Sequence, residues 1–173
     1  MESQGFLLAI AQIAVALAGF SGLVVATRGA SPEGWSTRDI WSLAWMFGTS
    51  LGTLFLALLP ILLFLLRLGP EAVSTVASLL MAAFMVVFAT SMALSSRKLS
   101  KLGEPPRVRY FSAAATLLLL TCGCLAGFGA LGTFGQAAMG VFVLGLTACL
   151  LVSALALVVF LTLFARGAKI SSC

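Results

Sequence analysis

Five long apolar runs without a single charged residue constrain this chain more than any other feature. They cover residues 6–27, 40–66, 72–94, 110–131 and 137–164. A helix needs about 20 mostly apolar residues to cross the hydrocarbon core of a bilayer. Only 9% of the 173 residues are charged, so little polar sequence remains to surround these runs with water. We therefore predict an all-α bundle of five transmembrane helices, a single membrane domain over residues 1–173 with no soluble domain.

The distribution of basic residues predicts how the bundle is oriented. Short loops rich in Lys and Arg resist translocation and stay in the cytoplasm. With five spans, nine of the ten basic residues fall on one side, in the 28–39 loop, the 96–109 loop and the C-terminal tail, and Arg67 falls on the other. We expect the N-terminus outside, the C-terminus in the cytoplasm, and the inner (plasma) membrane of a bacterium as the location.

An alternative is that the first apolar run is a cleaved signal peptide, which would leave four spans. Its start, Met-Glu-Ser-Gln, lacks the basic residues with which such peptides begin. Its apolar run is also longer than the usual length of about 7–15 residues. The sequence therefore favours a retained first span.

Two segments between the runs carry signals that end or prevent a helix. Gly69 is a residue type that commonly ends helices, and Pro70 suits the first turn of the next one, so we expect the second helix to stop at Gly69. Pro105–Pro106 cannot continue a helix, so we predict a basic cytoplasmic loop over residues 96–109.

That loop is the predicted contact to anionic lipid headgroups or to a cytosolic partner. It carries five positive charges and one negative charge. Each basic side chain near an anionic membrane contributes about 1 kcal/mol of binding. No aromatic residues lie between the basic ones, so we expect no nucleic-acid partner. The expected contact residues are Arg97, Lys98, Lys101, Arg107 and Arg109.

Aromatic residues mark the predicted cytoplasmic boundary of the membrane. Trp35, Trp41 and Trp45 flank the start of the second run, and Tyr110 begins the fourth. Such residues are enriched where a bilayer meets water, and we interpret them as interfacial anchors. A ligand cage built from the three tryptophans is the less favoured alternative.

Small residues recur where membrane helices would need to pack closely. Lipid offers helices no hydrophobic reason to associate, so close packing depends on small side chains and a few polar contacts. We predict backbone-to-backbone contacts on the first and fourth runs, either within one subunit or between subunits. The residues concerned are Ala14, Ala18, Gly22 and Ala26 in the first run, and Gly123 and Gly127 in the fourth.

Gln12 is the candidate functional polar group. It lies about two turns into the first run, on a face with Ala9, Ala16 and Gly19. Repeated around an oligomer, that face would form a narrow pore lined by amides and backbone without a charged filter. The simpler interpretation, which the sequence favours, is an interhelical hydrogen bond contributing about 1 kcal/mol.

The missing residue types exclude several function classes. The chain has no histidine and only five carboxylates, and the runs contain no ionisable group of the kind that coupled transporters place at membrane depth. The run from Gly127 to Gly132 spells G-x-G-x-x-G, but it lies inside an apolar helix where the dinucleotide-binding mechanism has no preceding strand. Cys122 and Cys124 leave a zinc site two ligands short. We expect no enzyme activity, catalytic residue, metal site or cofactor.

Two functions remain as predictions. The first is a small non-enzymatic membrane protein that self-associates into a homo-oligomer and forms a passive pore or channel. The second is a membrane anchor whose basic 96–109 loop docks anionic lipid or a cytosolic partner. An enzyme acting on lipids is the least favoured, because the titratable groups lie in the loops.

Overall fold

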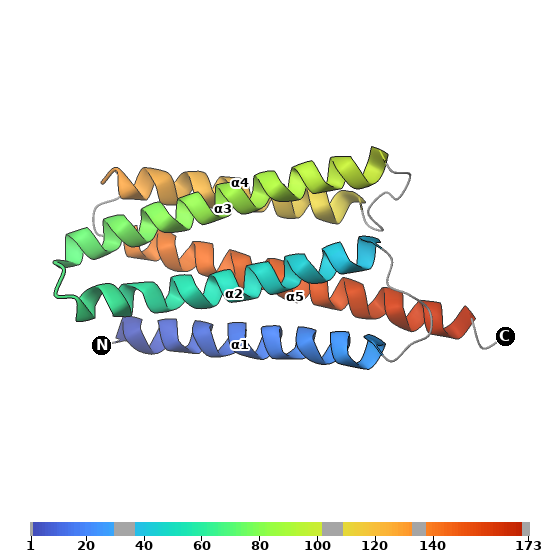
Figure 1. Cartoon of the computed structure of the whole chain (residues 1–173). Helices are drawn as coiled ribbons and strands as arrows, with labels where there is room; N and C mark the ends of the chain where they lie inside the picture. Colours follow the sequence, from blue (N-terminus) through green and yellow to red (C-terminus); the bar gives the residue numbers. More distant parts are fainter. Residues whose placement is uncertain (1, 30–36, 102–108, 133–137, 171–173) are drawn as a thin grey trace.

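The structure, a computed structural model, describes residues 2–29, 37–101, 109–132 and 138–170. These ranges contain helices and turns and no strand (Figure 1). All five helices are long and apolar enough to span a membrane. The predicted all-α class with five spans is therefore confirmed. The helices are α1 (Glu2–Gly29), α2 (Thr37–Leu65), α3 (Pro70–Lys101), α4 (Arg109–Ala130) and α5 (Ala138–Ile170).

The outer surface of the bundle is apolar, as expected of a protein surrounded by lipid. Phe55, Val87 and Leu117 expose 70%, 64% and 66% of their surface, and each lies in the middle of its helix. A helix at a water-exposed surface normally carries charged or polar residues on its outer face. The chain is an integral membrane protein with its apolar residues on both the inside and the outside.

Successive helices run in opposite directions, so the two termini lie at opposite ends of the bundle (Figure 1). The C-terminal ends of α1, α3 and α5 therefore lie at the same end as the N-terminal ends of α2 and α4. This end carries Arg97, Lys98 and Lys101, whereas Arg67 and Glu71 lie at the other end. The fold thus gathers basic segments at one end, and the compartment that this end faces stays a prediction.

α2 and α5 form the centre of the bundle. α5 contacts each of the other four helices, and α2 contacts α1, α3 and α5. α3 and α4 pair on one side, and α1 lies against α2 and α5 on the other side (Figure 1). Large buried side chains from all five helices fill the space between them: Leu7, Met46, Met81, Met85, Leu119, Phe142 and Leu146.

The prediction that residues 96–109 form a loop is wrong for its first part. α3 continues as a helix through Lys101. Residues 96–101 contain no Gly or Pro to stop the helix, and Leu99 is buried on the same helical face as Met85 and Ala89. Residues 102–108 lie outside the described residues, and Arg109 already belongs to α4. The basic segment therefore begins on a helix that extends past the apolar run.

The stop after α2 also differs from the prediction, because the helix ends at Leu65 and Arg67, rather than Gly69, takes the left-handed position that follows it. Arg67 has a positive φ of 59°. Its amide donates to the carbonyl of Phe64 at 3.0 Å, and the amide of Leu68 donates to the carbonyl of Leu63 at 3.4 Å. These two bonds form a Schellman motif, whose left-handed position is usually a glycine. Gly69 instead accepts a bond from the Val73 amide at 3.0 Å and so begins α3.

Two glycines allow α2 and α3 to approach closely. A Cβ added at Gly52 would overlap the ring of Phe84, and one at Gly48 would lie 2.7 Å from the ring of Phe88. The two rings stack on each other with centroids 5.5 Å apart. Aromatic rings from α3 therefore occupy the space that side chains on α2 would otherwise fill.

Candidate functional site

The side chain of Gln12 lies on the outside of the bundle, within the apolar part of α1. Its amide has no hydrogen-bond partner among the residues that the structure describes. Moving an amide from water into hydrocarbon without a hydrogen-bond partner costs on the order of several kcal/mol. Among the residues that the structure describes, Gln12 does not form the interhelical hydrogen bond that the sequence favours.

Small residues form one seam on the outer face of α1, and Gln12 lies on this seam. Gly5, Ala9, Ala16 and Gly19 are all exposed, and they are spaced around Gln12 in alternating steps of four and three residues. A 3.5-residue repeat keeps one seam of a helix facing a partner helix along its length. A Cβ added at Gly5 or Gly19 would meet no atom of the chain within 4 Å. The seam therefore leaves room for another backbone to approach.

The opposite face of α1 makes the contacts within the subunit. Leu7, Ile10 and Ala14 are buried against the rest of the bundle. At 100° per residue, Ala14 lies about 160° around the helix from Gln12. Ser21 is buried on this inner face, where its hydroxyl donates to the carbonyl of Leu17 at 2.8 Å. One helix thus has an inner face used by the subunit and an outer face that the subunit leaves open.

The four small residues predicted to pack in the first run, Ala14, Ala18, Gly22 and Ala26, do not lie on one face of α1. Ala14 is buried and Ala18 is half-buried, whereas Ala26 is exposed. A Cβ at Gly22 would lie 3.8 Å from the ring of Phe47 in α2. Each step of four residues turns about 40° around the helix, so this series of small residues passes from the buried side of α1 to its exposed side.

The glycines of α4 make their contacts within the subunit. A Cβ at Gly123 would lie 3.1 Å from the Cβ of Met85, and one at Gly127 would lie 3.8 Å from the Cβ of Ala82. Both neighbours belong to α3. The sequence left open whether these glycines pack within or between subunits, and the structure places them between α3 and α4 of the same chain.

A row of hydroxyl groups inside the bundle was not predicted from the sequence. Thr49, Ser50 and Thr53 of α2 are buried, as is Ser153 of α5. The Ser50 and Ser153 hydroxyls lie 2.7 Å apart, and the Thr53 hydroxyl donates to the Thr49 carbonyl at 2.7 Å. The spacing of 49, 50 and 53 on one helical face could have indicated this row. Because these hydroxyls are already paired, they offer no continuous polar path through the subunit.

The interfacial aromatic residues lie partly outside the described part of the chain. Trp41 is exposed, and its ring centroid lies 6.5 Å from that of Trp45. Trp45 is half-buried and packs edge-on against Phe88 of α3 with centroids 5.0 Å apart. Trp35 and the side chain of Tyr110 lie outside the described residues. Trp45 therefore packs on a ring of α3, and the two tryptophans that the structure describes do not face each other as parallel walls of a cage.

The basic side chains of α3 lie together on its last turns. Arg97, Lys98 and Lys101 are all exposed. Arg107 and the side chain of Arg109 lie outside the described residues. Within the described part of the chain, no three His, Cys, Asp or Glu residues come together in a way that could hold a metal ion. In the same ranges, Cys122, Cys124 and Cys149 are free thiols, and two of them are buried among apolar side chains.

Comparisons with known protein families, with curated proteins and with solved structures find no match to this chain.

Proposed function

We propose that this chain is a non-enzymatic membrane protein that assembles into a homo-oligomer through α1 and forms a passive pore between its subunits. The exposed, unpaired amide of Gln12 carries the proposal. A glutamine amide is both a donor and an acceptor, so copies of the same residue related by symmetry can pair with one another. Interhelical hydrogen bonds of this kind contribute about 1–2 kcal/mol in model membrane peptides.

The arrangement of side chains on α1 supports a ring of subunits. Gln12 lies in the middle of the exposed arc of α1, with Val15 on one side and Ile13 on the other, both 52% exposed. In a closed ring, the larger apolar side chains contact the neighbouring subunits while Gln12 faces the axis. Ala16 and Gly19 line the same axis and occupy little of it. Such a pore has an amide and backbone lining and no charged filter.

A path between subunits is preferred to a path through one subunit for a physical reason. The interior hydroxyls of Ser50, Ser153 and Thr53 are bonded to one another or to backbone carbonyls. Large side chains such as Met81 and Phe142 fill the remaining interior and are almost completely buried. Water and ions require polar groups along their whole route, and the described core of the subunit does not provide them.

The test combines oligomeric state with flux. The purified protein is expected to run as a defined oligomer in detergent and to pass small ions or dyes when reconstituted in liposomes. Gln12→Leu should weaken the assembly and change the flux, whereas Thr147→Leu, on the exposed surface of α5, should change neither. A monomeric protein without flux would overturn the proposal. Unchanged assembly and flux in Gln12→Leu would reduce Gln12 to a packing residue.

An anchor function is the second candidate, and the helical extension of α3 favours it. Arg97, Lys98 and Lys101 lie on the last turns of α3 and are exposed at the basic end of the bundle. Three basic side chains held on one short helical stretch add about 3 kcal/mol of attraction to an anionic surface. Neutralising all three with Gln should weaken binding to anionic vesicles or to a cytosolic partner. Binding that persists with an intact topology would count against this function.

A further inference from the structure

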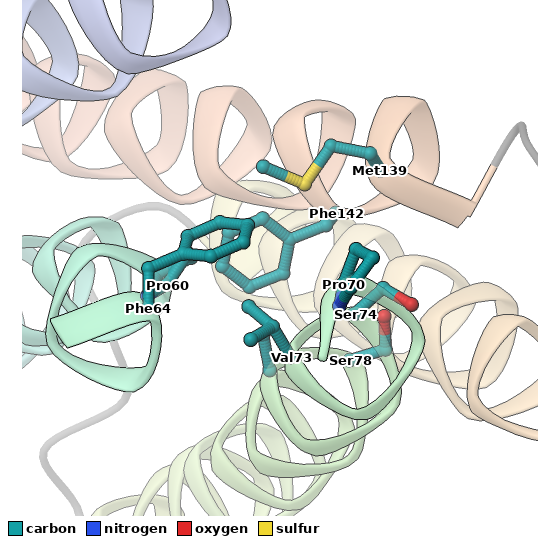
Figure 2. Close-up of a pocket in the computed structure, with 9 residues that line it drawn as sticks. Pro60, Phe64, Pro70, Val73, Ser74, Ser78, Met139 and Phe142 are labelled. Atoms are coloured by element: carbon teal, nitrogen blue, oxygen red, sulfur yellow. The ribbon is translucent and has the colours of Figure 1, made fainter. Parts of the chain in front are cut away.

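A pocket lies between α2, α3 and α5 at the end of the bundle opposite the basic segments (Figure 2). Its volume is about 200 Å³. Most of its wall is apolar and consists of Pro60 and Phe64 of α2, Val73 and Ala77 of α3, and Met139 and Phe142 of α5. It is separate from the outer face of α1, because none of its lining residues belongs to α1.

One buried hydroxyl in this pocket has no partner. Ser78 is 1% exposed and lines the pocket, and its hydroxyl has no hydrogen bond to any residue that the structure describes. The other described hydroxyls that are buried to this degree all have partners, among them Ser21, Ser50 and Thr53. Buried polar groups are normally hydrogen-bonded, so an unpaired one indicates a partner that is not part of the chain.

The hydroxyl of Ser74 also lines the pocket, and its hydrogen bond determines which kind of ligand group can pair with Ser78. Ser74 lies one helical turn before Ser78 on the same face of α3 (Figure 2). Its hydroxyl donates to the carbonyl of Glu71 at 3.0 Å. Ser74 has therefore already used its proton, and Ser78 is the free side-chain donor of the pocket. None of the lining residues is charged. The complementary ligand is uncharged and mostly apolar, and it carries a hydrogen-bond acceptor.

The size and position of the pocket indicate how such a ligand enters. A cavity of about 150 Å³ holds benzene, and pockets for drug-sized molecules begin at about 300 Å³, so this pocket holds a short alkyl segment or a single ring. Phe64 is 45% exposed and Pro70 is exposed, so the pocket reaches the surface between the end of α2 and the start of α3. Ser78 lies about 12 Å along α3 from Pro70. The pocket therefore opens at the end of the bundle, beside Arg67 and Glu71, and extends from there toward the apolar part of α3.

We propose that this pocket binds a neutral acyl group, with its carbonyl oxygen accepting a hydrogen bond from Ser78 and its alkyl part lying against Pro60 and Phe142. Ester carbonyls are abundant acceptors at the edge of the hydrocarbon region. An acyl group matches both the apolar wall and the single donor. The source of the group is either a phospholipid of the bilayer or a smaller ester dissolved in it. This site does not depend on the assembly proposed for α1.

Photo-crosslinking in phosphatidylcholine vesicles tests the site with two probes. One is a diazirine-labelled methyl octanoate, and the other is a phosphatidylcholine with a diazirine in one acyl chain. Labelled peptides are identified by mass spectrometry in the intact protein. We expect saturable labelling of residues 60–64, 73–78 and 139–142, which unlabelled methyl octanoate reduces.

The variants separate the pocket from general lipid contact. Ser78→Ala should lower this labelling at least fivefold, and Ser74→Phe should lower it by filling the pocket. Ser91→Ala should leave it unchanged, because Ser91 lies on the exposed side of α3 and its hydroxyl bonds only to the Val87 carbonyl at 2.7 Å. Far-ultraviolet circular dichroism checks that each variant remains helical.

Each outcome of the experiment decides one question. Labelling by the phospholipid probe alone identifies the bilayer as the source, and labelling by the small ester alone identifies a free amphiphile. Labelling by both supports the site without preference for either source. Labelling that does not saturate, that spreads evenly over the outer helix faces, or that stays unchanged in both Ser78→Ala and Ser74→Phe would overturn the proposal.

Discussion

The hydroxyls of Ser50 in α2 and Ser153 in α5 lie 2.7 Å apart and join the two central helices of the bundle. Both residues are buried, at 0% and 2% exposure. Ser153 also lies within 3.5 Å of the carbonyl of Met46, one turn before Ser50. Because α2 and α5 together contact every other helix, this bond fixes the position and register of the pair around which the bundle packs.

Loss of either hydroxyl should destabilise the protein modestly. Ser153→Ala leaves the Ser50 hydroxyl without its partner, and Ser50→Ala leaves the Ser153 hydroxyl with only its 3.5 Å bond to the Met46 carbonyl. Each change should cost about 1 kcal/mol in a membrane protein. The double variant should cost less than the sum of the two single ones, because it leaves no unpaired partner. Unfolding in mixed detergent micelles measures these free energies. Thr147→Ala is the control, because the exposed Thr147 hydroxyl bonds only within α5. Additive effects would contradict the pairing.

A methyl group at Gly52 should disrupt the contact between α2 and α3. The added Cβ overlaps the Phe84 ring, so Gly52→Ala should lower the free energy of unfolding by about 1–3 kcal/mol. Gly140→Ala is the matched control, because a Cβ there meets no atom within 4 Å. Combining Gly52→Ala with Phe84→Leu, which replaces the ring by a smaller side chain, should recover part of the lost free energy of unfolding. If Gly52→Ala and Gly140→Ala unfold alike, the close contact is absent.

Relief of backbone strain at Arg67 should stabilise the turn between α2 and α3. A non-glycine residue in the left-handed region costs about 1 kcal/mol, and Arg67 has a φ of 59°. Arg67→Gly should therefore raise the free energy of unfolding by up to about 1 kcal/mol. Arg67→Gln removes the same charge but keeps the Cβ, so it should not show this gain. Equal effects of the two substitutions would assign the change to charge rather than to strain.

A bulky side chain on the outer face of α1 should block assembly without unfolding the subunit. A Cβ at Gly19 meets no atom of its own chain within 4 Å, so one subunit tolerates Gly19→Leu, but the leucines of all subunits would collide around the narrow axis that Gln12 faces and prevent the ring from closing. Cross-linking and size-exclusion chromatography should show loss of the oligomer, together with reduced flux. Gly140→Leu introduces the same side chain at another open glycine and should leave the oligomer intact. Equal behaviour of the two variants would remove α1 as the interface.

The nine-to-one distribution of basic residues should set the orientation of the protein. A reporter fused after Cys173 is expected to read as cytoplasmic, because short segments rich in Lys and Arg are retained on that side. Replacing Arg97, Lys98 and Lys101 with Gln should weaken this preference, and adding three lysines to the 67–69 turn should weaken it further. If a reporter that works only outside the cytoplasm is active when it is fused after Cys173, the proposed orientation is refuted.

The sequence by itself determined the number of helices and their membrane character. Runs without charge, such as residues 40–66, must be surrounded by lipid or by one another. A helix lets the backbone N–H and C=O groups of such a run hydrogen-bond to each other. The boundaries were less well predicted, because a helix does not have to end where the apolar run ends. Residues 96–101 are polar enough to leave the membrane but contain nothing that stops a helix, so α3 continues through them.

Tertiary structure alone decided which side of each helix meets a partner. Gln12 and Ala14 are two residues apart in one apolar run, yet one is exposed and the other is buried. In lipid the outer face of a helix is as apolar as its inner face, so hydrophobic periodicity no longer marks the core. For the same reason, the pairing of Ser50 with Ser153 and the unpaired hydroxyl of Ser78 became visible only once the helices were placed side by side. The sequence could name the polar groups within the membrane, and only the packing of the helices shows which of them still lack a partner.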